Sequence, residues 1–214
     1  MKRGIPCFLA AWMFLQGSAQ GQSGLGATRS DASNEIPSFL VGALPSQPRT
    51  AGEPIRSAPA QQFACNAGYV QKQCDEEMAV LRKALANYRA YDPGEWTWVL
   101  VRSEDWKVVL LASRLSPGVP ALTLVGARTT FFDEALVAGS SGRLSELMDT
   151  WHLGRGALLD LAVRHELGHA LCNDANERKA ERLARLLEQR KPVSCEAKAE
   201  DRCRHCELAL WSKG

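Results

Sequence analysis

Residues 165–169 read His165-Glu166-Leu167-Gly168-His169 and lie within a long apolar stretch of the chain. Positions i and i+4 of a helix lie on the same face, so two imidazoles at this spacing can share one Zn²⁺ ion. Glu166 then stands beside the remaining coordination position, where it can act as a base for metal-bound water. The alternative is a pair of core histidines that bond to backbone carbonyls, which this spacing favours less.

The residues around this pentapeptide predict a buried helix. Apolar or small residues with moderate to strong helix propensity occupy most positions from 157 to 171, and no proline interrupts them before Cys172. Glycines at 154 and 156 place the start of the helix near Arg155 or Ala157. Polar groups inside such a helix are costly to bury without partners, and a bound metal would satisfy them.

A catalytic zinc ion usually has three protein ligands, and two routes to the third are visible. Cys172 follows His169 by three residues and lies on the same helical face, although a disulfide explains this cysteine at least as well. The other route is a second helix that begins after Asn176, a good N-cap residue. In that helix Glu177 and Glu181 share one face, so one can bind the metal while the other orients a metal-binding histidine.

Together these two segments resemble the gluzincin-type zinc metallopeptidases. In that family H-E-x-x-H on one helix is completed by a glutamate from a motif of the form N-E-x-x-S/A-D, and residues 176–181 read N-E-x-x-A-E here. The resemblance implies that His165, His169 and Glu177 bind Zn²⁺ and that Glu166 is the general base and acid. It also implies that Glu181 bonds to a zinc-binding histidine. Its motifs lie within residues 160–185.

The resemblance implies an enzyme that hydrolyses peptide bonds with a zinc-activated water. A peptide or protein substrate would pair with an edge strand of the sheet, for which we predict residues 129–137. An oxyanion donor is expected as well, but Tyr91, His152 and His205 are only nominal candidates. Two alternatives stay open: an exported zinc-binding or interaction module without turnover, and a disulfide-stapled structural protein in which the pentapeptide is incidental.

The N-terminal segment has the pattern of a secretory signal peptide. Lys2 and Arg3 precede an apolar run, and small residues follow it at positions 17–19. We therefore predict cleavage near Ala19 and a secreted or periplasmic protein. Residues 20–62 are rich in Gly, Ser, Ala, Pro and Gln, which predicts a disordered linker or a pro-segment.

The remaining chain predicts an α+β domain over residues 63–191, followed by a Cys-rich tail over residues 192–214. Its elements are expected as a helix, a small sheet of three or four strands with antiparallel or mixed pairing, and then the zinc-site helix and the glutamate helix. The predicted helices span 65–91, 143–150 and 177–188 besides the zinc-site helix, and the predicted strands span 96–102, 106–113, 121–125 and 129–137.

Charge and cysteine content limit the partners of the mature chain. The full sequence has 26 basic and 24 acidic residues, and loss of residues 1–19 removes Lys2 and Arg3, which leaves 24 of each sign. This balance predicts no nucleic-acid partner. No later apolar run is long enough to span a bilayer, so we predict no stable membrane insertion after cleavage. Six of the seven cysteines remain after cleavage, which favours disulfides such as Cys65–Cys74. The C-x-x-C at 203–206 could instead be a redox motif or half of a zinc site.

Overall fold

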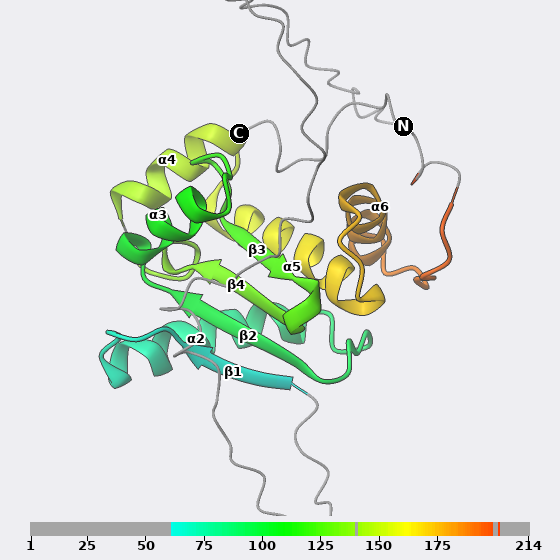
Figure 1. Cartoon of the computed structure of the whole chain (residues 1–214), viewed down its shortest axis with the longest axis horizontal. Helices are drawn as coiled ribbons and strands as arrows, with labels where there is room; N and C mark the ends of the chain where they lie inside the picture. The colour runs from blue at the N-terminus through cyan, green and yellow to red at the C-terminus, as the bar shows by residue number, and fades with distance from the viewer. Residues whose placement is uncertain (1–60, 140, 199–200, 202–214) are drawn as a thin grey trace, which may run out of the picture. The chain divides into compact units, whose positions relative to one another are not determined.

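The structure is a computed structural model that describes residues 61–139, 141–198 and 201. In these residues an α+β fold combines five α-helices with a four-stranded mixed sheet (Figure 1). In chain order the elements are β1 (Gln61–Cys65), α2 (Gln71–Ala86), β2 (Trp96–Val101), α3 (Ser103–Ala112), β3 (Ala121–Leu124), η1 (Val125–Ala127), β4 (Thr129–Asp133), η2 (Glu134–Leu136), α4 (Gly142–Trp151), α5 (Arg155–Cys172) and α6 (Glu177–Glu188).

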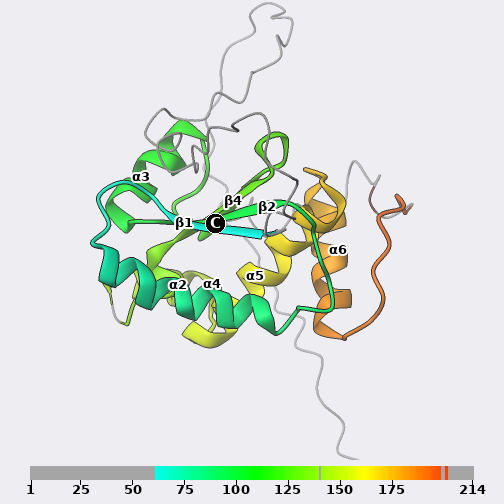
Figure 2. The ribbon, with the colours of Figure 1, turned by 90° about the horizontal axis from the view of Figure 1, so that it is seen from below.

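The strand order in the sheet is β1-β2-β4-β3. The first three strands run parallel to one another, whereas β3 pairs antiparallel with β4 and closes one edge. Figure 2 shows α2 and α5 on one face of the sheet and α3 on the opposite side. Because both faces are covered, the central strands β2 and β4 are almost wholly buried, and their sequences WTWVLV and TTFFD are correspondingly apolar.

The most substantial correction concerns residues 106–113, which form part of helix α3 and not the predicted strand. Trp106, Val109 and Leu110 are buried, at the i, i+3 and i+4 positions of one helical face. Val108 and Leu111 face away and are 49% and 79% exposed. The run of Val and Leu resembles a strand, but the parallel pairing of β2 with β4 requires a crossover connection, and α3 lies within it.

Strand β1 is a second correction, because residues 61 and 62 fall in the predicted linker and residue 65 at the predicted start of a helix. The strand forms by pairing with β2, with Gln61 opposite Trp96 and Cys65 opposite Leu100. Because this pairing joins segments that are distant in sequence, the five residues of β1 carry no local pattern that predicts a strand. The helix of this region is confirmed, but it spans only Gln71–Ala86 of the predicted residues 65–91.

The predicted edge strand is also wrong. Residues 129–133 form β4, which lies between β2 and β3 in the interior of the sheet, and the chain then turns into η2. The Asp133 side chain accepts a hydrogen bond from the backbone N–H of Ala135 and so ends the strand. Strand β3 is therefore the edge on this side of the sheet, and it is the strand that packs against α5.

The other predicted elements are confirmed to within one or two residues, namely β2, β3, α4, α5 and α6. Disulfides join Cys65 to Cys74 and Cys172 to Cys195, and such bonds are typical of oxidising compartments. No helix in the described ranges is long and apolar enough to cross a bilayer. The predicted signal peptide, most of the predicted linker, and the C-x-x-C at 203–206 lie outside the described residues.

Candidate metal centre

The two histidines of the pentapeptide lie side by side on helix α5. His165 is fully buried and His169 is 4% exposed, and their ring centroids are 5.0 Å apart. These polar side chains lie in the interior of the protein, since every residue of α5 from Ala162 to Ala170 is buried. Two imidazoles held this close in an apolar environment require polar partners.

The chain reverses directly after α5 and brings helix α6 back against it. Asn173 adopts the left-handed conformation with φ of 46° and ends α5. The backbone N–H of Asp174 then donates to the carbonyl of His169 over 3.2 Å. Asn176 caps the new helix, as predicted, by accepting from the N–H of Lys179. This short turn is what allows Glu177, the first residue of α6, to reach the histidines.

Close packing of α5 and α6 depends on Gly168, the fourth residue of the pentapeptide. A Cβ at this position would lie 2.7 Å from the carbonyl oxygen of Ala180 and 3.1 Å from its Cα. Both atoms belong to the backbone of α6, which could yield only by moving the helix. Ala180 is itself buried, so small residues on both sides bring the two helices together.

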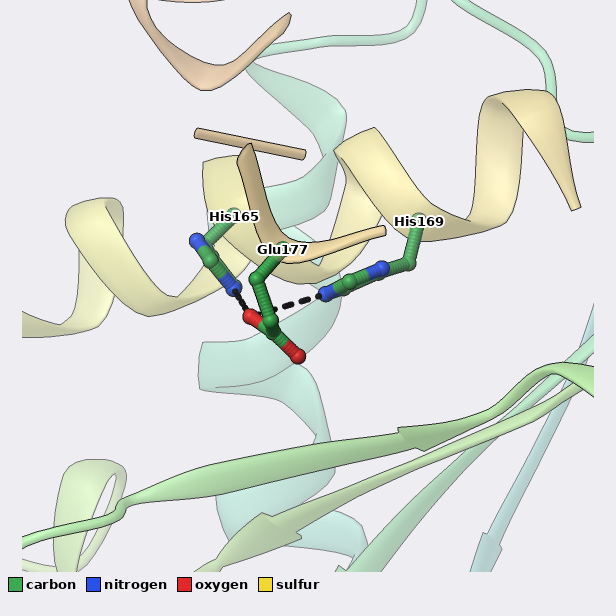
Figure 3. Close-up of side chains that lie close together, drawn as sticks. All are labelled: His165, His169 and Glu177. Atoms are coloured by element: carbon green, nitrogen blue, oxygen red, sulfur yellow. Dashed lines mark hydrogen bonds and ion pairs between the residues drawn. The ribbon is translucent and has the colours of Figure 1, made fainter. Parts of the chain in front are cut away.

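His165, His169 and Glu177 converge on one point (Figure 3). The Oε2 atom of Glu177 lies 3.0 Å from Nε2 of His165 and 3.5 Å from Nε2 of His169. Ligand atoms about 2.1 Å from a tetrahedral zinc ion lie roughly 3.4 Å from one another, so these separations suit a shared ion. The group can therefore hold a metal ion, and its members are the three ligands that the sequence predicts.

The orienting partner of His169 is a backbone group. Its Nδ1 atom lies 2.7 Å from the carbonyl oxygen of Asp174, which leaves Nε2 directed at Glu177. The structure places the carboxylate of Glu181, expected by resemblance to bond to a histidine, 3.0 Å from Arg185 on the same helix. Cys172 is bonded to Cys195, so its thiolate is not the third ligand.

Glu166 is 1% exposed and lies beside the histidines on α5. Its Oε2 atom accepts a 2.7 Å hydrogen bond from the hydroxyl of Thr123 on β3. Its Oε1 atom is buried and has no hydrogen-bond partner among the described residues. Burial raises the pKa of this carboxyl group, and the charges of the two histidines oppose that rise. A buried carboxylate with one oxygen that accepts no hydrogen bond is suited to exchange a proton with a molecule bound at the metal group.

The charges of the group are strongly coupled. Burial by itself would lower the pKa of His169, but the hydrogen bond that its ring donates to Glu177 and the charge of Glu166 raise this pKa to about 9. Burial would raise the pKa of Glu177, but hydrogen bonds with His165 and His169 lower it to about 2. Without metal the group therefore holds a proton at neutral pH, and a cation that binds here would take the place of that proton.

The C-terminal tail fastens the start of α6. Arg182 forms a buried ion pair with Asp201, with donor–acceptor distances of 3.0 and 2.9 Å. The side chain of Asn176 donates to the carbonyl of Asp201 over 3.2 Å. Lys179 reaches back across the turn to Asp174 at 2.8 Å. With the Cys172–Cys195 disulfide, these contacts fix the turn from both sides.

Sequence reasoning missed two contributors to this site, Thr123 and the carbonyl of Asp174. Neither belongs to a motif, and Thr123 is separated from Glu166 by 43 residues, so no local signal identifies it. Of the nominal oxyanion candidates, the two that the structure describes, Tyr91 and His152, do not belong to the metal group. Tyr91 donates its hydroxyl to the carbonyl of Lys191, and His152 caps the end of α4. His205 lies outside the described residues.

Comparisons of this chain with models of protein families, with curated proteins and with solved structures found no match. The resemblance to gluzincins therefore stays a prediction from the motifs within residues 160–185.

Proposed function

We propose that this protein is a small exported zinc metallopeptidase of gluzincin type. The observation that carries the proposal is the convergence of His165, His169 and Glu177 beside a buried carboxylate with an open oxygen. Two histidines and one carboxylate are a donor set that catalytic zinc sites use, with the fourth position left for water. Glu166 supplies no atom to the group of three, so the presence of this glutamate beside the group favours catalysis over metal storage.

Zinc bound here would lower the pKa of a water molecule and polarise the carbonyl of a substrate. Glu166 would accept one proton from the water that attacks the carbonyl carbon. The C–N bond then breaks, and Glu166 returns the proton to the leaving nitrogen, which departs as an amine. The second proton of the water stays on the new carboxyl group and passes to the amine, so the products are a carboxylate and an ammonium, and Glu166 ends in its initial state. The substrate is a peptide or protein, whose backbone would pair with β3, an edge strand of the sheet among the described residues.

A zinc-binding module without turnover is the second candidate, and one observation favours it. The histidines and Glu166 are each less than 5% exposed, and structural zinc sites are closed in this way. Glu177 is the open side of the group, with a side chain that is 46% exposed. Access to a substrate would therefore come from the side of Glu177.

Metal analysis and one substitution separate these functions. The purified protein should contain one zinc ion, and hydrolysis of unstructured protein substrates should stop when a chelator removes it. Glu166→Gln should retain the zinc and lower kcat at least about 100-fold, the scale of general acid–base catalysis. Zinc without hydrolysis in the unmodified protein would establish the binding module instead. Purified protein without zinc would exclude both.

A further inference from the structure

A chain of hydrogen bonds crosses the sheet and ends on Glu166. The indole N–H of Trp96 on β2 donates to the hydroxyl of Thr130 on β4 over 2.9 Å. The hydroxyls of Thr130 and Thr123 lie 2.7 Å apart, and these residues are direct partners in the β3–β4 register. Thr123 then meets Oε2 of Glu166 at 2.7 Å. Three adjacent strands and the helix α5 each contribute one member.

The donor and acceptor of each hydrogen bond in this series follow from its first and last members, Trp96 and Glu166. The Trp96 indole can only donate, and an ionised carboxylate can only accept. Since Thr123 uses its single proton toward Glu166, Thr130 must donate to Thr123. Each hydroxyl therefore both accepts and donates, and bonds in such a series strengthen one another in a buried environment. Trp96 and Thr130 are 2% and 0% exposed, so water does not compete for either of them.

We propose that Thr123 is a positioning residue that holds the Glu166 carboxylate through Oε2 and so makes Oε1 the proton-accepting atom. This inference rests on the proposed peptidase function. A carboxylate has two equivalent oxygens and rotates about its last bond. A donor fixed on the sheet removes that freedom, so Oε1 stays directed toward the place of the reacting water. Thr130 and Trp96 act through Thr123 by fixing the direction of its proton.

The test compares Thr123→Val with Thr123→Ser in the zinc-loaded protein. Valine keeps the shape of threonine but cannot donate, whereas serine restores the hydroxyl. We expect Thr123→Val to lower kcat about tenfold or more, the scale that small errors of position cost, with KM and zinc affinity within about twofold of the original. Thr123→Ser should recover most of kcat. The matched control is Thr97→Val on β2, whose side chain alternates to the opposite face of the sheet and should leave kcat unchanged.

A second measurement does not depend on activity. In metal-free protein, the fall in Tm caused by Thr123→Val should shrink when Glu166→Leu is already present, because the carboxylate that loses its donor is then absent. Equal falls in both backgrounds would show that Thr123 only packs and would overturn the inference. A kcat for Thr123→Val equal to that of Thr97→Val, or no recovery by Thr123→Ser, would overturn it as well.

Failure of the proposed function would look different. If the unmodified protein hydrolyses nothing, both proposals fail, whatever the Tm values show. If it hydrolyses peptides and Glu166→Gln does not, the peptidase function stands, and the Thr123 variants alone decide the positioning role.

Discussion

Gly168 on α5 lies against the backbone of Ala180 on α6 so closely that no side chain fits between them. The second x of H-E-x-x-H is therefore a packing position as well as part of a motif. Because Glu177 begins α6, the separation of the two helices sets the distance from its carboxylate to both imidazoles.

Gly168→Ala should destabilise the protein even though alanine favours helices more than glycine does. The gain in helix propensity is about 1 kcal/mol, whereas forcing a methyl group into close-packed backbone costs about 1–3 kcal/mol and moves α6. Zinc affinity should fall with stability, as measured by chelator competition and chemical unfolding. Gly156→Ala is the control, because a Cβ on that exposed glycine of the same helix meets nothing within 4 Å. Equal effects of both variants would contradict the packing role.

Glu177→Ala should weaken zinc binding far more than Glu181→Ala. Loss of groups that only orient a ligand already costs about 10–100-fold in affinity, so loss of the carboxylate ligand should cost at least about 100-fold. Glu181 lies one turn further along α6 and pairs with Arg185 at an exposed site, where ion pairs contribute little. Chelator competition measures both affinities. A large loss in Glu181→Ala would restore the orienting role that the gluzincin resemblance implies for that residue.

The stability of the metal-free protein should fall as pH rises above neutrality. The pKa of His169 is raised from 6.5 to about 9 in the fold, so its stabilising contribution is complete below pH 6.5 and is lost as pH rises through 9. The pKa of Glu177 is lowered from 4.5 to about 2, so its contribution is complete above pH 4.5 and is lost as pH falls through 2. Both contributions are therefore complete between pH 4.5 and 6.5.

Thermal unfolding of chelator-treated protein measures this dependence. Glu177→Gln removes the charge that sustains the high pKa of His169, so Tm of this variant should decline less between pH 6.5 and 9. An unchanged decline would assign the dependence to other groups.

Removal of the Cys172–Cys195 disulfide should lower both stability and zinc affinity. The bond closes a loop with a sequence separation of 23 residues, and loops of this size are worth roughly 3 kcal/mol. The paired substitution Cys172→Ser with Cys195→Ser avoids a free thiol. The same pair at Cys65 and Cys74 should lower Tm but leave zinc affinity unchanged, because that bond lies outside the metal group. Equal zinc affinities in the two double variants would contradict the link between the tail and the site.

The sequence could predict the parts of the site that depend on residues close to one another in the chain. Helical spacing places His165 and His169 on one face, and the N-cap at Asn176 fixes where the glutamate helix begins. Both features depend on residues within one or two turns of one another. The candidate metal-binding group therefore follows from residues 165–177 together with one tight turn.

The parts that could not be predicted depend on partners distant in the chain. The valines and leucines of α3 fit a strand as well as a helix, and only the crossover between β2 and β4 decides between them. The interior place of β4 and the contact of Thr123 with Glu166 arise from the same sheet order. No pattern within a single segment records which strand becomes its neighbour.

The ion pair between Arg182 and Asp201 can form only after the ribosome has added residue 201. All three residues that could hold the metal are translated before Asp201, and the helix that carries Glu177 gains its ion pair with the tail only when Asp201 joins Arg182. A nascent chain that has just exposed residue 177 therefore lacks the contact that holds α6. Chains that terminate before residue 201 would therefore carry His165, His169 and Glu177 and still lack this ion pair.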